Sequence, residues 1–219
     1  MTLLDLARGP GLYWSVIIMI TGLVWRLSTV LLMPYRRNLS APGARAKGSL
    51  RGALTTIVTR TSPYRSFRSR TMPALMLSYT FHFGLLIILL GGAPHILLMK
   101  TATGLGWPPL PKGIISLASG LTLAALILVA IRRLRHPVLR LLSNLDDYFS
   151  LGLTILPVLS GLLLAEETYV SYELLLAIHI LSVEALLIWL PFGKLAHVVL
   201  VVAGRAAQGA KFGHKGAIT

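Results

Sequence analysis

Five stretches of this 219-residue chain are apolar over the length that a membrane helix requires. They cover residues 11–33, 76–99, 113–131, 148–165 and 172–202. A bilayer core of about 30 Å is crossed by about 20 helical residues, and lipid leaves no backbone group unpaired. The sequence therefore predicts an all-α membrane protein, a single membrane domain built as a five-transmembrane-helix bundle. We expect the first stretch to be retained as a span rather than cleaved as a signal peptide.

Composition supports a membrane protein and excludes several other classes. Only 13% of the residues are charged, against about 25% in soluble domains. Lys and Arg number 21 against 7 acids, but the basic surface rich in aromatic residues that stacks on bases is missing, so we predict no nucleic-acid binding. The chain has no cysteine. This excludes disulfides, an iron–sulfur cluster held by this chain and a thioether-attached haem.

Basic residues gather in alternate connections between the expected spans. The segment 34–73 carries nine of them and no acid, the turn after the third span carries four, and the tail carries three. By the positive-inside rule these regions are cytoplasmic, which places the N-terminus outside and the C-terminus inside. The residues are Arg36, Arg37, Arg45, Lys47, Arg51, Arg60, Arg65, Arg68 and Arg70, then Arg132, Arg133, Arg135 and Arg140, then Arg205, Lys211 and Lys215.

Two local patterns near the cytoplasmic side have structural interpretations. Leu50, Leu54 and Ile57 follow a helical period beside arginines; a short helix in the headgroup region, a docking surface for a soluble partner and a solvated loop all remain open. Before the fourth span, Asp146 and Asp147 are interpreted as acids that stabilise a helix start, not as catalytic groups.

The chain has six histidines, and four of them lie within expected spans. His136 and His214 lie in a basic turn and in the tail, and we expect both to be solvated. Ionisable residues inside a membrane are costly and tend to be functional. The four intramembrane histidines are His82 and His95 in the second span, and His179 and His197 in the fifth.

The positions of these histidines predict two pairs. On one continuous helix, His179 and His197 would share a face about 27 Å apart, since 18 residues make five turns. Antiparallel packing of the second and fifth spans would bring His82 to His197 on the inner side and His95 to His179 on the outer side. Each pair could bind the iron of a haem. A proton relay, a metal-ion transport path, and histidines that only join helices in a cofactor-free anchor or assembly subunit are the alternatives.

Three stretches carry a family resemblance: FHFGLLIILLG around His82, the RRLRHP turn, and LLAIHILSVEALLIWLPFGKLAHVV. With them the chain resembles the gamma (cytochrome b) subunit of respiratory nitrate reductase and its relatives in sulfur-metabolising and heterodisulfide-reductase-linked membrane complexes. The resemblance covers nearly the whole chain. It implies five spans, an outside N-terminus and two b-type haems between the second and fifth spans, in the inner membrane of a prokaryotic cell.

By this resemblance, His82 and His197 bind the inner haem and His179 binds the outer haem. The family pattern places the remaining ligand ten residues after His82, where this chain has Gly92. The nearest candidate is His95, which on an ideal helix points about 140° away from His82. We expect the residues Gly91, Gly92 and Pro94 to bend or unwind this turn and so allow His95 to serve as the ligand.

The resemblance also implies electron exchange between membrane quinol or quinone and a cytoplasmic-side redox partner that carries iron–sulfur, flavin or molybdenum centres. Lys112 resembles in location a lysine implicated in quinol binding, and Lys100 and Trp107 are its neighbours. All three are also explained as interfacial anchors. Glu184, the one acid well inside a span, is a candidate proton carrier or a hydrogen-bond partner for another helix. The chain alone is expected to perform no terminal substrate chemistry.

Overall fold

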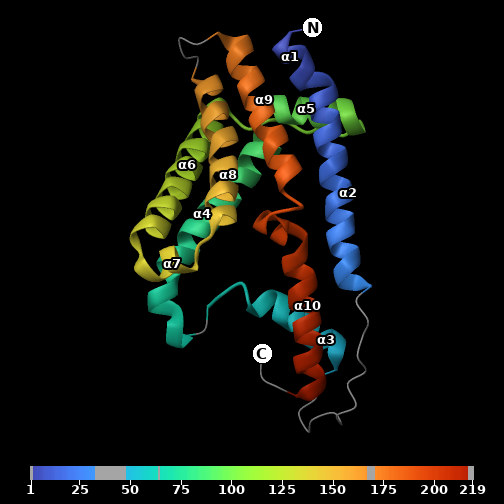
Figure 1. Cartoon of the computed structure of the whole chain (residues 1–219), viewed down its shortest axis with the longest axis vertical. Helices are drawn as coiled ribbons and strands as arrows, with labels where there is room; N and C mark the ends of the chain where they lie inside the picture. The colour runs from blue at the N-terminus through green and yellow to red at the C-terminus, as the bar shows by residue number, and fades with distance from the viewer. Residues whose placement is uncertain (1, 33–47, 64, 167–170, 217–219) are drawn as a thin grey trace. The chain divides into compact units, whose positions relative to one another are not determined.

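The computed structural model describes residues 2–32, 48–63, 65–166 and 171–216, and every regular element within them is a helix (Figure 1). Five helical segments are long and apolar enough to cross a membrane. The predictions of an all-α fold and of five candidate spans are therefore confirmed for the described part of the chain. The segments are Leu3–Leu31, Arg68–Gly91, Lys112–Arg135, Leu145–Ala165 and Tyr172–Trp189.

The chain divides into two compact units, each described here by itself. The first unit comprises Met1–Ile18 and Met72–Trp189, and the second comprises Met19–Thr71 and Leu190–Thr219. The first holds α1 (Leu3–Leu6), η1 (Ala7–Gly11), the start of α2 (Leu12–Leu31), most of α4 (Arg68–Gly91), α5 (Ala93–Thr103), α6 (Lys112–Arg135), α7 (Pro137–Leu142), α8 (Leu145–Ala165) and α9 (Tyr172–Trp189). The second holds the rest of α2, α3 (Ser49–Thr59), η2 (Arg65–Phe67), η3 (Lys194–Ala196) and α10 (His197–Lys215).

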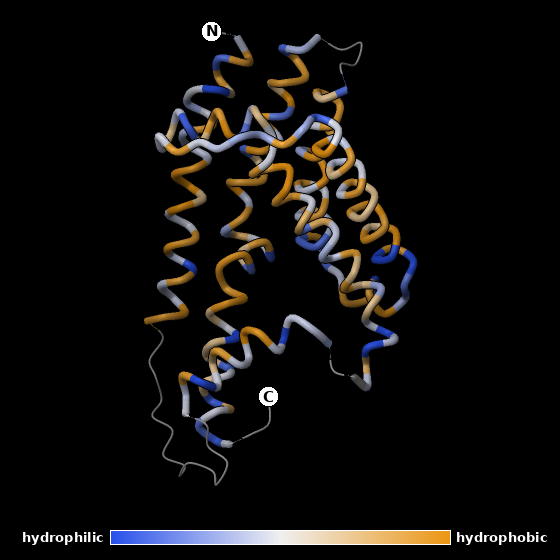
Figure 2. Tube along the Cα trace, turned by 180° about the vertical axis from the view of Figure 1, so that it is seen from behind, coloured by the Kyte–Doolittle hydropathy of each residue, from blue (hydrophilic) through white to orange (hydrophobic). Residues whose placement is uncertain are grey.

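The long helices present large apolar side chains outward. Trp25 is 70% exposed, Leu117 is 64% exposed and Leu156 is 50% exposed. In Figure 2 these helices are coloured mainly as hydrophobic, and hydrophilic colour gathers around the turn at α7. A soluble protein rarely exposes so much contiguous apolar surface, whereas lipid covers it favourably. The exposed surface is that of a multi-pass membrane protein.

Small and hydroxyl side chains fill the contacts between helices of the first unit, where α8 packs on α6 and α9. Thr122 on α6 is fully buried and occupies the space that a side chain on Gly84 of α4 would need. Small residues allow close approach of membrane helices, which associate by packing and by local hydrogen bonds. These contacts hold α4, α6, α8 and α9 together around the histidines discussed below.

The start of α8 confirms the interpretation of the acids before the fourth span. Asn144 caps the helix, with its side chain accepting from the Asp147 amide at 3.3 Å while Asp147 accepts from the Asn144 amide at 3.0 Å. Asp147 also pairs with Arg133 of α6 at 2.9 Å. A carboxylate near the positive end of a helix dipole is stabilising. These acids therefore have a structural role in joining α6 to α8.

Two of the expected spans are shorter than the sequence predicts, because glycine and proline end them early. The expected segment 76–99 is divided at Gly92, where α4 ends and α5 begins as a separate helix with Pro94 in its first turn. The expected segment 172–202 is divided between Trp189 and Lys194, around Pro191 and Gly193. The expectation that His179 and His197 lie on one continuous helix is therefore wrong. The predicted bend at Gly91–Pro94 is confirmed.

In the second unit α3 lies against α10. The contact runs through Gly52 on α3 and through Gly209 and Gly213 on α10, so that backbone meets backbone. The solvated-loop interpretation of this segment is wrong, since it is helical, and its face with Leu50 and Leu54 is turned outward, 75% and 58% exposed. The basic residues Arg36, Arg37, Arg45 and Lys47 lie outside the described residues.

Candidate functional site

The structure brings His95 of α5 and His179 of α9 together within the first unit. Their ring centroids are 6.2 Å apart and the ring planes are inclined by 28°. His179 lies within a candidate span, and His95 lies at the point where the chain turns out of α4. The pairing that the sequence predicted for these two residues is therefore present, and the break at Gly92 is what permits it.

The imidazole of His95 is oriented by the helix residues next to the break at Gly92. Its Nδ1 lies 2.9 Å from the carbonyl oxygen of Ile88, seven residues earlier, on the last full turn of α4. A carbonyl can only accept, so Nδ1 carries the hydrogen and Nε2 carries the lone pair. Gly92 supplies the room, because a Cβ at that position would lie 3.1 Å from His95 Nδ1. The chain break therefore sets both the position and the tautomer of His95.

The imidazole of His179 sits in a notch on α8. Its Cε1 would lie 3.0 Å from a Cβ on Gly161, so the notch exists because that side chain is missing. Its Nδ1 lies 3.1 Å from Ser160 Oγ, which itself donates to the Leu156 carbonyl at 2.8 Å and therefore accepts from the ring. Ser182 Oγ donates to the His179 carbonyl at 2.7 Å. With the Ser160 hydroxyl donating to Leu156, the His179 ring takes the same tautomer as His95, with the lone pair on Nε2.

Sequence reasoning missed the residues that form this notch. Ser160 and Gly161 lie nineteen and eighteen positions before His179, and no local pattern joins them to it. Two signals were nevertheless available. A Ser–Gly pair interrupts an otherwise apolar span, and Ser182 follows His179 by three residues. Small and hydroxyl residues inside a membrane helix mark a place of close helix contact.

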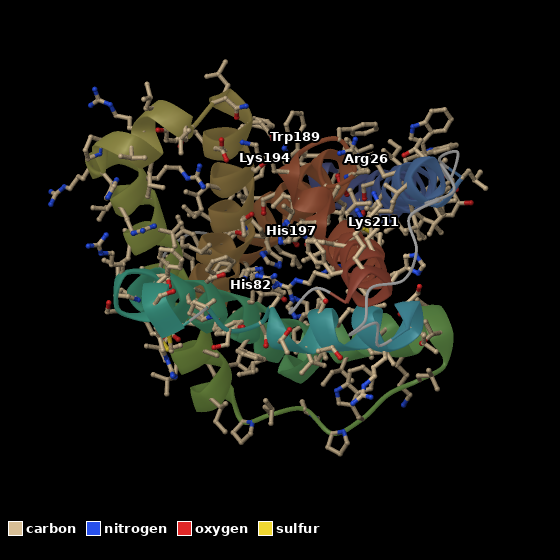
Figure 3. All side chains as sticks on the ribbon, turned by 90° about the horizontal axis from the view of Figure 1, so that it is seen from below. Arg26, His82, Trp189, Lys194, His197 and Lys211 are labelled. Carbon is tan, nitrogen blue, oxygen red and sulfur yellow. The ribbon has the colours of Figure 1, made fainter. Side chains whose placement is uncertain are left out.

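His82 and His197 show the same arrangement of the ring, each within its own unit. His82 Nδ1 lies 2.7 Å from the Ser78 carbonyl one turn earlier on α4. His197 Nδ1 lies 2.9 Å from the Lys194 carbonyl. A carbonyl can only accept, so Nδ1 is the donor in both of these rings, and Nε2 is the nitrogen that a metal would bind. Figure 3 labels His82 on α4, and His197 and Lys211 on α10.

The donor set of the His95–His179 pair fits the iron of a haem. Two histidines that would hold one haem iron between them must have their rings close together within the helix bundle. The observed separation is 6.2 Å. A ligating histidine normally donates its other ring N–H to a neighbouring oxygen, as both of these do. Among the described residues, His, Asp and Glu form no group of three or more that could hold a metal ion, so imidazole pairs are the donor set to consider.

The predicted quinone-site residues have different surroundings. Trp107 donates its indole N–H to the Leu90 carbonyl at 2.6 Å, which commits this donor to the end of α4. The side chain of Lys100, near the end of α5, packs over Gly106, and Lys112 begins α6. Both lysines are exposed. The two lysines therefore remain candidates for binding a polar ligand. The N–H of Trp107 is not a candidate, because it already donates to the Leu90 carbonyl.

Glu184 lies apart from these residues, on a face of α9 that meets the N-terminal helix. Its carboxylate lies where a side chain on Gly11 would stand, within 2.6–3.0 Å of that Cβ position. The residue is 8% exposed, and its Oε1 is buried without a hydrogen-bond partner among the described residues. Gly11 ends η1, a turn of π-helix distorted at Gly9. Glu184 therefore lies at the contact between α9 and the N-terminal span.

Comparison with curated proteins gives one alignment that covers most of both chains. The chain is similar to a protein of Nitratidesulfovibrio vulgaris, with 31% identity over 206 residues that cover 94% of this chain and 86% of that protein. The relative is named only "Protein", a name that states no activity. No protein-family model matches the chain. No solved structure matches it.

Proposed function

The chain belongs to one family with the Nitratidesulfovibrio vulgaris protein, and we propose that it is a haem b-binding membrane subunit of a respiratory oxidoreductase. In this proposal it exchanges electrons between membrane quinol or quinone and a redox partner on the cytoplasmic side. The nitrate reductase gamma subunit and its relatives are the wider group to which we assign it. The membrane would be the inner membrane of a prokaryotic cell, with the N-terminus outside.

One observation carries the proposal: two imidazoles inside a membrane helix bundle are held at 6.2 Å with both Nδ1 atoms committed to oxygens of the protein. The Nδ1 atoms are engaged by oxygens of neighbouring helices, the Ile88 carbonyl of α4 and the Ser160 hydroxyl of α8. Here the N–H groups are used to orient the rings, and the Nε2 lone pairs are the groups left for a ligand. That arrangement supports axial ligation of an outer haem by His95 and His179.

From the resemblance alone, we propose His82 and His197 as ligands of a second, inner haem; the two residues belong to different units, and each is described within its own. Their rings have the same tautomer as the outer pair, set by the carbonyls of Ser78 and Lys194. Bound haem supplies a one-electron couple whose potential the axial histidines and their hydrogen-bond partners tune. The residues of the chain would orient these rings through their Nδ1 atoms.

The end of α5 and the start of α6 are proposed to carry the polar groups for a quinol. A quinol that gives up two electrons also releases two protons, so its oxygens need a hydrogen-bonding group near water. We propose that Lys100 or Lys112 supplies this group, because both are exposed and flank the loop beside His95. Glu184 is proposed as a proton-carrying group in the same half of the protein. Trp107 is omitted, because its N–H is already used.

The partner is proposed to dock on basic residues of the second unit. Arg51 and Lys211 are exposed there, and Arg205 lies on the same helix as Lys211. An acidic surface would be attracted to this charge, and the attraction would weaken with salt. The partner would carry the iron–sulfur, flavin or molybdenum centre that performs the substrate chemistry, since this chain has no cysteine to hold an iron–sulfur cluster.

Reduction by a quinol tests the proposed function. The purified, oxidised protein is mixed anaerobically with a soluble quinol, and the absorbance of b-type haem is followed with time. We expect the reduced band to rise in the wild-type protein. In the Lys100→Ala, Lys112→Ala double variant, the rate of this rise should be at least tenfold lower. Arg205→Ala is the matched control and should keep the wild-type rate. A wild-type protein that holds haem but is not reduced would contradict the proposal.

Replacing Gly161 by alanine tests the notch that holds His179. The added methyl group would lie 3.0 Å from His179 Cε1, so the ring must move. We expect the outer haem to be lost or bound at least tenfold more weakly, while the inner haem is retained. Redox difference spectra of the purified variant measure both. Gly152→Ala is the matched control on the same helix, since a Cβ there meets nothing within 4 Å. Equal haem content in the two variants would contradict this account of the notch.

A further inference from the structure

We infer that Trp107 is a positioning residue for His95, acting through the end of α4. The inference rests on the proposed function, because it concerns the outer haem. The residues that carry it are the last carbonyls of α4 and the loop 104–111 that connects α5 to α6. All of them belong to the first unit.

The loop 104–111 satisfies carbonyls that the break at Gly92 would otherwise leave without donors. The Leu90 carbonyl accepts from Trp107 Nε1 at 2.6 Å, and the Gly91 carbonyl accepts from the Leu110 amide at 2.9 Å. The final carbonyls of a helix have no partner within the helix, and an unpaired one in a membrane costs several kcal/mol. Two donors from one loop therefore hold the last turn of α4 in its present position.

The loop is also seated by side-chain packing on the same turn. A Cβ on Gly91 would lie 2.6 Å from Leu110 Cδ1 and 3.1 Å from Ile115 Cδ1, so the missing side chain of Gly91 is the seat for Leu110. Gly91 is buried. The loop consequently cannot shift along α4 without either losing these contacts or moving the turn with it.

The same turn of α4 holds the ring of His95. The Ile88 carbonyl accepts from His95 Nδ1 at 2.9 Å and from the Gly92 amide at 3.1 Å. Ile88 lies two residues before Leu90, so a tilt of the Leu90 peptide moves the oxygen that orients His95. The angle between the His95 and His179 ring planes, 28° here, would change with it. Trp107 would thereby influence the plane of the His95 ring through the last turn of α4.

The positioning role of Trp107 can be tested separately from a role as an anchor at the membrane surface. Trp107 is 38% exposed, as a tryptophan at a membrane surface would be. Phenylalanine keeps an aromatic ring at this position but has no N–H to donate. Trp107→Phe therefore removes the hydrogen bond to Leu90 and leaves most of the apolar anchoring. Trp25→Phe makes the same chemical change at a side chain that is 70% exposed, and serves as the control.

The test compares both variants with the wild type by redox titration and by electron paramagnetic resonance of the oxidised protein. The low-spin ferric signal responds to the angle between the axial imidazole planes, a property that a loss of general stability would not shift. In Trp107→Phe we expect the outer haem to change its signal and midpoint potential while the inner haem keeps both. Trp25→Phe should match the wild type at both haems.

A second measurement needs no haem. In protein labelled with ¹⁵N-tryptophan, the Trp107 indole N–H should exchange with solvent at least tenfold more slowly than the indole N–H of free N-acetyltryptophanamide in the same buffer, because it is hydrogen-bonded. Equal exchange, or an unchanged outer haem in Trp107→Phe, would overturn the positioning role alone. A wild-type protein without haem would overturn the proposed function and this inference with it, whatever the indole measurement gives.

Discussion

Replacing His179 by alanine is expected to remove half of the haem from the protein. The imidazole would be an axial ligand of the outer haem, and alanine offers no atom to bind the iron. The two proposed sites have separate ligands, so the inner haem should remain, and haem content should fall from two to one per chain. Haem extraction, together with the reduced-minus-oxidised spectrum of the purified variant, measures the loss.

Two further variants make this result specific. His95→Ala should remove the same haem, since the two rings face each other at 6.2 Å. His136→Ala should remove none, because His136 lies outside the spans at the end of α6. If His95→Ala retained two haems while His179→Ala lost one, His95 would not be the ligand. Another group would then have to complete the outer site.

Replacing Gly52 by alanine is expected to detach α3 from α10. A Cβ on Gly52 would collide with the carbonyl oxygen of Gly209 and would lie 2.7 Å from Gly213 Cα, and neither backbone atom can move aside cheaply. Overpacking of this kind costs about 1–3 kcal/mol. We expect faster tryptic cleavage after Arg51 within α3, because a helix must open locally before it is cut. Thermal unfolding in detergent should begin at a lower temperature.

The matched control for this variant is Gly204→Ala on α10. A Cβ at Gly204 meets nothing within 4 Å. Alanine is favoured over glycine in a helix interior by about 0.5–1 kcal/mol, so Gly204→Ala should be as stable as the wild type or slightly more stable. Equal cleavage rates in Gly52→Ala and Gly204→Ala would show that the glycine contact between α3 and α10 does not hold α3.

The number and type of the elements could be predicted from the sequence because they depend on local composition. Apolar runs of about 20 residues can only be helices in lipid. Their ends were less predictable. The run 76–99 is apolar throughout, but α4 ends at Gly91, since Gly92 leaves the helical conformation with φ −72° and ψ 126°. Likewise Pro191 and Gly193 end α9 although apolar residues continue on both sides.

The candidate site was predictable in its ligands but not in its surroundings. Intramembrane histidines are rare enough that four of them on two spans predicted pairing, and His95 and His179 are paired. Gly161 and Ser160 contribute through a contact between helices, which no local pattern encodes. The α3 segment shows the same limit. Its helical period was visible in Leu50, Leu54 and Ile57, but Gly52, which carries no apolar signal, makes the contact with α10.

The haem content of the purified wild-type protein tests the central claim most directly. The account predicts two b-type haems per chain, extractable because no cysteine attaches them, with a sharp reduced band that indicates two histidine ligands at each iron. A preparation that is folded and helical but carries no haem, with the rings of His95 and His179 still facing each other, would contradict it.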